Sequence, residues 1–461
     1  MKKRLIAGLM ALAMIFALAA CGGGGSGGGG DAKAASAAEE ASSKSEAAAE
    51  SEAAAESEAA AESEAKAEVS GEGASITIFN SKMEIQSQME EMAQKYSEEK
   101  GVNVEVYYSS DTVAAHMSTK YASKDPYVLA MVDAKDIYSL GPEHAIDLSD
   151  QAWVKDTTQA ISVDGKVLGF PCCVEARGLL YNGDAIEAAT GAPFDPSTIK
   201  TTADFQALID QIVAGGMELP VGLQKEDWSL GAHYLQQVYE MHDDPDAFIA
   251  GIKDGSIKLI DDPVFNALMD TFDVLKEYNY AKDAPISAER EVTEMMLAEG
   301  DLCFKFGGNW DWSNMVGTEY TEHLGMMPVP SDLDGYNTKL VGGGSKYFFI
   351  DNSVSEEQQQ AAKDFLNWLV YDEEGQDFLV NTCALVPAFS NITLPVSDPL
   401  GASVKAYADK GDLTPDYRYA PDDHYAKNGA SFQKYLAGEI DRAGLADEIT
   451  AYWATAEVGA H

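Results

Sequence analysis

The stretch SITIFNSKMEIQSQMEEMAQKYSEEKGVNVEV, residues 75–106, predicts a strand, a helix and a second strand in succession. Residues 75–79 are rich in β-formers, and the valines of residues 102–106 alternate with other residues, as in a strand. Between them, apolar side chains recur at helical spacing up to Gly101, a typical helix-ending glycine: Ile85, Met89, Met92, Ala93 and Tyr96. A β-α-β unit of this kind has parallel strands.

The same alternation of strand and helix continues along the chain. We expect strands at residues 127–132, 169–174, 178–181, 219–223, 302–306 and 346–350. Helices are predicted at residues 202–214, 230–241, 263–278, 288–299 and 356–371, with one or two closing helices in 431–453. A chain of 461 residues is too long for one core, so we expect an α/β protein with two lobes.

The composition argues against several functions. The formal net charge of −44 repels nucleic acids and anionic lipid headgroups. There is no CxxC pair, HExxH or P-loop, so we expect no metal, no cofactor and no catalytic residues. Cysteines beyond the N-terminal region are interpreted as small buried apolar residues, with a bridge between the last two left open: Cys172, Cys173, Cys303 and Cys383.

The N-terminal region has the features of a targeting sequence. Residues 1–20 carry three basic residues and then an apolar run, as a secretory signal peptide does. They end in Leu-Ala-Ala before Cys21, which resembles the bacterial lipobox and implies cleavage before a lipidated Cys21. Residues 22–74 are glycine-rich and then acidic, with three SEAAAE repeats, and we interpret residues 21–74 as a disordered tether.

Four further stretches support a family resemblance, together with residues 76–106. They are DGKVLGFPCCVEARGLLYN at 164–182, GGNWDWSNM at 307–315, VGGGSKYFFI at 341–350 and AAKDFLNWLVYDEEGQDFL at 361–379. In this order they resemble the extracellular solute-binding proteins of carbohydrate ABC transporters, in the maltose-binding-protein-like group. The resemblance implies a two-lobed periplasmic-binding-protein-like fold of type II, with the ligand in a cleft between lobes.

The resemblance also implies lobe boundaries. We expect an N-lobe of residues 75–173 plus 344–384 and a C-lobe of residues 174–343 plus 385–461. The chain would cross between them near Val174, Gly343 and Cys383. Residues 342–344 are three glycines, which suit a hinge because glycine accepts large backbone changes; a plain loop is the alternative.

A sugar needs aromatic faces for its C–H patches and polar groups for its hydroxyls. By resemblance, Trp310 is the stacking platform, flanked by Asn309 and Asp311, and Trp312 supports it. Trp228 follows a predicted strand and is a second candidate platform. The alternative is that the tryptophans belong to the core.

Polar candidates follow the predicted strands, where ligands bind in α/β proteins. Asp133 closes a strand, with the alternative that it caps the next helix. Glu175 resembles the cleft glutamate of the family. Arg177 departs from the usual apolar residue and could bind an acidic sugar, with a solvated surface charge as the alternative. The remaining candidates are loop and hinge residues, with ordinary capping as the alternative for those in loops: Asn80, Ser81, Lys82, Asp111 and Gly344.

We therefore predict a monomeric, lipid-anchored protein on the extracellular face of the cell membrane, which captures a carbohydrate for an ABC importer. The permease subunits and their intracellular ATPase are partners that the resemblance implies. Three alternatives stay open: a non-sugar ligand such as a polyamine, an extracellular glycan-degrading enzyme, and an adhesin for a macromolecule.

Overall fold

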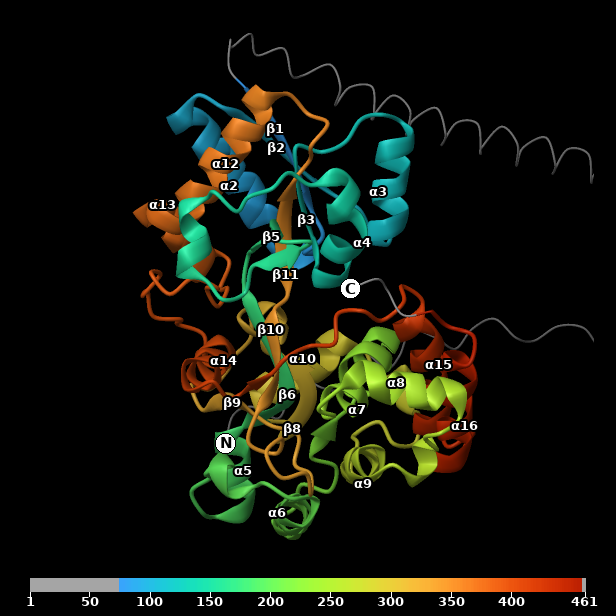
Figure 1. Cartoon of the computed structure of the whole chain (residues 1–461). Coiled ribbons are helices and arrows are strands. Elements are labelled where there is room, and N and C mark those ends of the chain that lie inside the picture. Colours follow the sequence, from blue (N-terminus) through green and yellow to red (C-terminus); the bar gives the residue numbers. More distant parts are fainter. Residues whose placement is uncertain (1–73, 458–461) are drawn as a thin grey trace, which may run out of the picture. The chain divides into compact units, whose positions relative to one another are not determined.

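The predicted β-α-β unit is present at the start of the first of two sheets (Figure 1). In the computed structural model, which describes residues 74–457, strand β1 (Ser75–Asn80) pairs in parallel with β2 (Asn103–Tyr108). Helix α2 (Gln86–Lys100) joins them and ends at Gly101, whose φ of 70° lies in the left-handed region. That conformation is open to glycine at little cost, so the helix stops where the sequence predicts.

The first sheet has the strand order β2-β1-β3-β11-β5-β4. The added strands are β3 (Leu129–Asp133), β4 (Ile161–Val163), β5 (Lys166–Pro171) and β11 (Lys346–Ile350). Successive residues of β3 face opposite sides: Leu129 and Met131 pack towards α2 and α12 (Glu356–Tyr371), and Ala130 and Val132 towards α3 and α4. Helices α3 (Val113–Ala122) and α4 (Ala134–His144) therefore cover the second face of this sheet.

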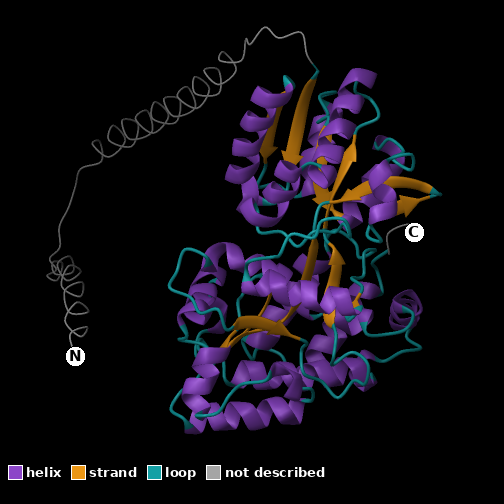
Figure 2. Cartoon of the chain, turned by 90° about the vertical axis from the view of Figure 1, so that its left-hand side faces the viewer, coloured by secondary structure: helices purple, strands orange, loops and turns teal. Residues whose placement is uncertain are grey.

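The second sheet has the order β12-β10-β6-β8-β7, with β9 also paired to β6. Its strands are β6 (Val174–Asn182), β7 (Val221–Gly222), β8 (Phe304–Gly308), β9 (Leu324–Met327), β10 (Leu340–Gly344) and β12 (Leu413–Thr414). The remaining α-helices are α5 (Gly183–Thr190), α6 (Thr202–Ala214), α7 (Gln237–Glu240), α8 (Pro245–Asp254), α9 (Pro263–Glu277), α10 (Arg290–Glu299), α11 (Trp312–Met315), α13 (Glu373–Asp377), α14 (Pro399–Lys410), α15 (His424–Leu436) and α16 (Arg442–Trp453). The predicted α/β fold with two lobes is confirmed, and Figure 2 shows the two sheets one above the other.

Shorter helical segments join these elements. They are η1 (Met83–Ile85), η2 (Ala152–Asp156), η3 (Pro196–Thr198), η4 (Ser229–Tyr234), η5 (Leu259–Asp261), η6 (Pro285–Ser287), η7 (Asn309–Asp311) and η8 (Phe378–Thr382). The continuous helix predicted at 230–241 is wrong, because a π-helical turn, η4, precedes the short α7. Gly231 explains the distortion: a Cβ there would lie 2.4 Å from the carbonyl oxygen of Tyr425, so η4 packs backbone to backbone on α15.

The chain passes from one sheet to the other where three segments are hydrogen-bonded together. The amide of Cys172 donates to Lys346 (2.7 Å), that of Ser345 to Cys173 (3.2 Å), and that of Val174 to Val386 (2.9 Å). The first crossing thus lies between β5 and β6, the second between β10 and β11, and the third follows η8.

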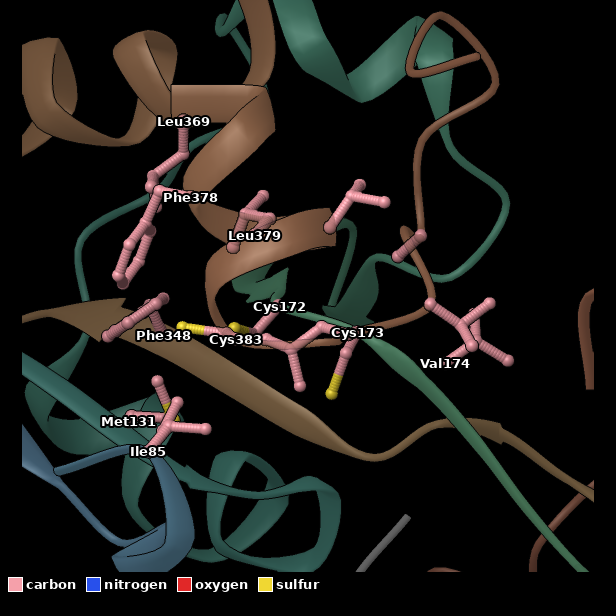
Figure 3. Packing of buried hydrophobic residues seen from close by; sticks show 14 of the residues in the cluster. Ile85, Met131, Cys172, Cys173, Val174, Phe348, Leu369, Phe378, Leu379 and Cys383 are labelled. Atoms are coloured by element: carbon pink, nitrogen blue, oxygen red, sulfur yellow. The ribbon is translucent and has the colours of Figure 1, made fainter. Parts of the chain in front are cut away.

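Apolar side chains fill the space beside these crossings (Figure 3). Cys172, Cys173 and Cys383 are buried there together with Phe348 and Phe378. Cys303 is buried in the core of the second sheet. These four cysteines have free thiols, which agrees with their interpretation as small apolar residues. The Cys303–Cys383 bridge, which the sequence left open, therefore does not form.

Close packing explains two of the three glycines of β10, Gly342 and Gly344. Their backbone is extended, since none of the three has a positive φ. A Cβ on Gly342 would lie 2.2 Å from the carbonyl oxygen of Glu175, and one on Gly344 would lie 2.1 Å from the hydroxyl of Tyr347. The prediction gave conformational freedom as the reason for these glycines, whereas the structure requires their lack of a side chain.

Three predictions concern residues outside those described. The signal peptide at residues 1–20 and the lipidated Cys21 fall there, as does the tether except for its last residue, Ala74. Within residues 74–457, we find no helix of sufficient length and apolarity to cross a lipid bilayer.

Candidate functional site

A cleft of about 740 Å³ is lined by residues that belong to both sheets. In the lobe of the first sheet, lining residues lie in the loop after β1 and at the start of α4. The lobe of the second sheet contributes the start of β6, the segment 228–236, the end of β8 and the segment 416–425. Eight of the twelve predicted ligand-binding residues line this cleft: Ser81, Lys82, Asp133, Glu175, Arg177, Trp228, Trp310 and Gly344.

Two tryptophans and a histidine form an aromatic group on one wall of the cleft. The ring of His233 lies 4.7 Å from that of Trp310 and 5.2 Å from that of Trp228, centroid to centroid. Arg290 lies over Trp228 at 5.6 Å and donates to the carbonyl oxygen of Trp310 (3.5 Å). Both tryptophans are partly exposed in the cleft, so each can offer a ring face to a ligand.

The sequence GGNWD builds this wall. A Cβ on Gly308 would lie 2.3 Å from the Trp310 ring, and one on Gly307 would lie 2.1 Å from a carboxylate oxygen of Asp311. The two glycines therefore allow the chain to fold back on itself after β8. Trp312, predicted to support Trp310, instead packs edge-on against Tyr320 in the core (4.7 Å).

Asn309 and Asp311 do not reach the cleft surface, contrary to prediction. The side-chain oxygen of Asn309 accepts the amide of Ala176 (3.0 Å), and Asp311 pairs with the fully buried ammonium of Lys305 (2.6 Å). Their side chains hold the loop of Trp310 against β6 and β8, because buried polar groups need such partners.

A buried charge cluster lies behind this loop. Glu294 receives hydrogen bonds from Arg290 (2.6 Å) and Asn314 (2.6 Å), and Lys305 lies 3.9 Å away. Burial, and then the nearby carboxylate of Asp311, raise the pKa of Glu294 to about 8, even though Lys305 opposes the shift. A protonated Glu294 offers a donor beside Asp311, whose Oδ1 has no hydrogen-bond partner among the described residues.

The loop after β1 carries an ion pair between the two sheets. The Nζ of Lys82 lies 2.6 Å from Glu175, at the start of β6, and 2.7 Å from Glu84. Burial opposes ionisation of Glu84, but the charge and hydrogen bond of Lys82 lower its pKa to about 2. Asn80 is fully buried and shapes this loop: it accepts the amide of Lys82 (2.9 Å) and donates to its carbonyl oxygen (2.9 Å). Asn80 was predicted to contact ligand and does not line the cleft.

Asp133 and Lys346 form a second ion pair, 2.5 Å apart. Asp133 is also the residue that precedes α4, and its amide donates to Asp136 (3.2 Å). Asp133 thus stands at the N-terminus of α4, as the capping alternative requires. It also lies in the cleft, where 44% of its side chain stays exposed. Asp111 lies apart, in an adjoining cavity of about 250 Å³ that also includes Ser81 and Asp133.

Arg177 is held by two carboxylates of the protein itself. Its guanidinium pairs with Glu240 at 2.5 Å and with Asp416, and its Nε donates to the carbonyl oxygen of His233 (2.9 Å). The prediction that Arg177 selects an acidic sugar is therefore not supported by its surroundings, since its charge is already balanced.

Several cleft residues were not predicted from the sequence. They include Met83, Glu84, Tyr108, Lys135, His233, Gln236, Arg290, Lys346, Asp416, Arg418 and Tyr425. Lys346 follows the glycine triplet, a signal that could have been used. Arg290 begins α10 and Arg418 lies in a loop after β12, where no local pattern indicates a cleft. Among residues 74–457, no group of three metal-ligating side chains is present.

Comparison with known proteins supports the fold. The family described as "Bacterial extracellular solute-binding protein" matches residues 91–410. A structure of RafE in complex with raffinose has a TM-score of 0.69 at 18% identity, covering 82% of this chain and 98% of RafE; a second RafE structure names Streptococcus pneumoniae. A sugar transporter protein from Bacillus licheniformis in complex with stachyose has a TM-score of 0.63 at 16% identity, covering 82% and 99%.

Proposed function

Because the chain belongs to the family of bacterial extracellular solute-binding proteins, we propose that it captures a sugar or oligosaccharide for an ABC importer. The similar structures include proteins solved with raffinose, stachyose and mannobiose, and all three share this fold at 16–18% identity. The proposal for this chain rests on its own cleft, where ring faces and hydroxyl-binding groups occur together.

The observation that carries the proposal is the aromatic wall of Trp228, His233 and Trp310 beside charged side chains. Aromatic faces stack on the C–H patches of a sugar ring, and carboxylates and cations bind its hydroxyls. Glu175 and Asp133 are each held in place by a lysine, so their oxygens are oriented before a ligand arrives. Such preorganisation lowers the entropy that binding costs.

The rest of the role follows from the proposed ligand. The two lobes, 75–173 plus 344–384 and 174–343 plus 385–461, close on the sugar, because a ligand stabilises whichever form it contacts better. The protein works as a monomer, held to the extracellular face of the membrane through lipid on Cys21. It then presents the sugar to the permease subunits and releases it unchanged, with no catalytic step.

The alternative ligands and activities have less support. A polyamine is disfavoured because six cationic side chains line the cleft. A glycosidase needs a carboxyl group of raised pKa at its substrate. Glu294 has such a pKa, but its side chain is fully buried and does not line the cleft. For an adhesin we find no observation that favours a macromolecular ligand over a small one.

A thermal-shift and calorimetry screen of mono- and oligosaccharides on the full-length chain tests the proposal. We expect at least one saccharide to raise Tm and bind without being hydrolysed. Trp310→Ala should then weaken binding at least tenfold, whereas Tyr371→Ala, at an exposed aromatic outside the cleft, should leave it unchanged. If no saccharide binds, or if Trp310→Ala binds with full affinity, the proposal is wrong.

A further inference from the structure

Cationic side chains outnumber carboxylates in the lining of the cleft, although the chain as a whole is acidic. The formal net charge of the protein is −44, yet six cationic side chains and only four carboxylates line the cleft. The cations are Lys82, Lys135, Arg177, Arg290, Lys346 and Arg418. A cleft that merely shared the acidity of the surface would not have this excess.

Five of these six cations are already paired with carboxylates of the protein. The pairs are Lys82–Glu175 (2.6 Å), Lys135–Asp422 (2.7 Å), Arg177–Glu240 (2.5 Å), Arg290–Asp311 (3.7 Å) and Lys346–Asp133 (2.5 Å). Arg418 is the exception: within the part of the chain that the structure describes, it forms no ion pair. Asp416, two residues earlier, is bound to Arg177 instead.

Arg418 is nevertheless held in a fixed position. Its guanidinium lies 5.7 Å from the centre of the Tyr347 ring, and its Nη2 donates to the carbonyl oxygen of Gly344 (3.3 Å). Tyr347 is fully buried, so it provides a rigid support.

This arrangement leaves the guanidinium of Arg418 without a carboxylate in direct contact among residues 74–457. A guanidinium has five N–H donors in a planar fork, and hydrogen bonds to the carbonyl oxygen of Gly344 and to the side chain of Tyr138 leave part of that fork free. An oxyanion meets that fork with two parallel hydrogen bonds. A partly buried charge gains most from a partner of opposite sign, and a single unpaired cation matches a single negative charge.

We infer that the ligand is a saccharide that carries one singly charged acidic group, a carboxylate or a sulfate ester, which pairs with Arg418. This inference rests on the proposed function and narrows it to acidic sugars. The aromatic wall holds the sugar ring in the same cleft. The inference replaces Arg177, which the sequence suggested for this role, with Arg418, the one lining cation that forms no ion pair within residues 74–457.

The test is calorimetric titration of the full-length chain with pairs of ligands that differ only in charge. We would use disaccharides of galacturonic, glucuronic and mannuronic acid, each beside its methyl ester, and lactose beside its sulfate ester. An acidic member should bind roughly ten- to hundredfold tighter than its neutral partner, as a charge-assisted hydrogen bond predicts. Uronate or sulfate selectivity then identifies the acidic group.

Arg418→Gln should abolish this preference, so that the acidic ligand and its neutral partner bind with similar affinity. Arg418→Lys, which keeps the charge but lacks the fork, should retain part of it. The matched control is Arg442→Gln, since Arg442 pairs with Asp270 and Asp273 and does not line the cleft. In the wild-type protein, raising the salt concentration should weaken binding of the acidic ligand more than binding of the neutral one. This measurement needs no variant, so it does not depend on whether a variant folds.

The outcomes separate the two proposals. If neutral saccharides bind as tightly as acidic ones, or if Arg418→Lys and Arg418→Gln keep the full preference, the inference is wrong while the sugar-binding function stands. If no saccharide of either kind binds, the proposed function fails and the inference fails with it.

Discussion

The ammonium of Lys82 lies 2.6 Å from a carboxylate oxygen of Glu175, and this pair joins the loop after β1 to the start of strand β6. The two side chains are only 4% and 10% exposed. Because β1 belongs to the first sheet and β6 to the second, the pair ties the two lobes together beside their crossing strands. Charges removed from water in this way must stay paired.

Breaking the pair from one side should therefore be costly. Lys82→Met leaves Glu175 without its cation, and we expect the free energy of unfolding to fall by about 3–5 kcal/mol. Replacing both residues, Lys82→Met with Glu175→Leu, should recover a large part of that loss. Urea denaturation of the full-length chain measures both values.

The control is the exposed pair Lys434–Glu448, whose side chains are 45% and 33% exposed. Lys434→Met should cost no more than about 1 kcal/mol, because water screens such a pair. Equal losses for Lys82→Met and Lys434→Met would show that the Lys82–Glu175 pair does not act as a buried interaction.

A single added methyl group should disturb the aromatic wall. In Gly308→Ala the new Cβ would lie 2.3 Å from the Trp310 ring, so the ring must move out of its position. We expect at least a tenfold loss of saccharide affinity in calorimetry. Gly317→Ala is the control, since a Cβ there meets nothing within 4 Å and the φ of Gly317 is not positive. Unchanged affinity in Gly308→Ala would mean that the ring is not a platform for the ligand.

The buried cluster behind Trp310 should make stability depend on pH in a defined direction. Glu294 has a pKa of about 8 in the folded chain against an ordinary value of 4.5. Between pH 4.5 and about pH 8, Glu294 has released its proton in the unfolded chain but still holds it in the folded chain. Rising pH therefore favours unfolding. The wild-type protein should therefore lose on the order of 3 kcal/mol relative to Glu294→Gln between pH 4 and pH 7.5.

Glu448 provides a control of opposite sign. The hydrogen bonds of Lys434 and Ser431 lower its pKa, so its contribution is present above the ordinary pKa and lost as pH falls. Relative to Glu448→Gln, the wild-type protein should gain slightly as pH rises. Urea denaturation at several pH values gives both comparisons, and a difference between wild type and Glu294→Gln that does not change with pH would contradict the assignment.

The sequence predicts those parts of the fold that depend on local patterns. Strand β11 begins and ends where expected, helix α6 matches its predicted bounds, and Trp310 reaches the cleft because it follows a strand end. The partners of charged residues could not be predicted, since they depend on distant segments. Arg177 meets Glu240, 63 positions away, and Asp416, 239 positions away, so its position beside Glu175 gives no hint of its neutralisation.

The partners of the two polar neighbours of Trp310 could not be predicted either, although both residues adjoin Trp310 in the sequence. Asn309 and Asp311 flank the platform in the sequence, but a tight turn after Gly308 directs them inwards, to the amide of Ala176 and the ammonium of Lys305. Arg418 is the converse case. Its loop has no strand or helix pattern, and only the packing of Tyr347 and Gly344 brings it into the cleft.

Hydrogen exchange with and without a bound saccharide tests most directly whether the ligand is gripped between the two lobes. We expect protection on both sides of the cleft: at residues 81–84 and 133–135 from the first sheet, and at 228–236 and 416–425 from the second. Protection confined to one lobe, or located outside these segments, would contradict the account.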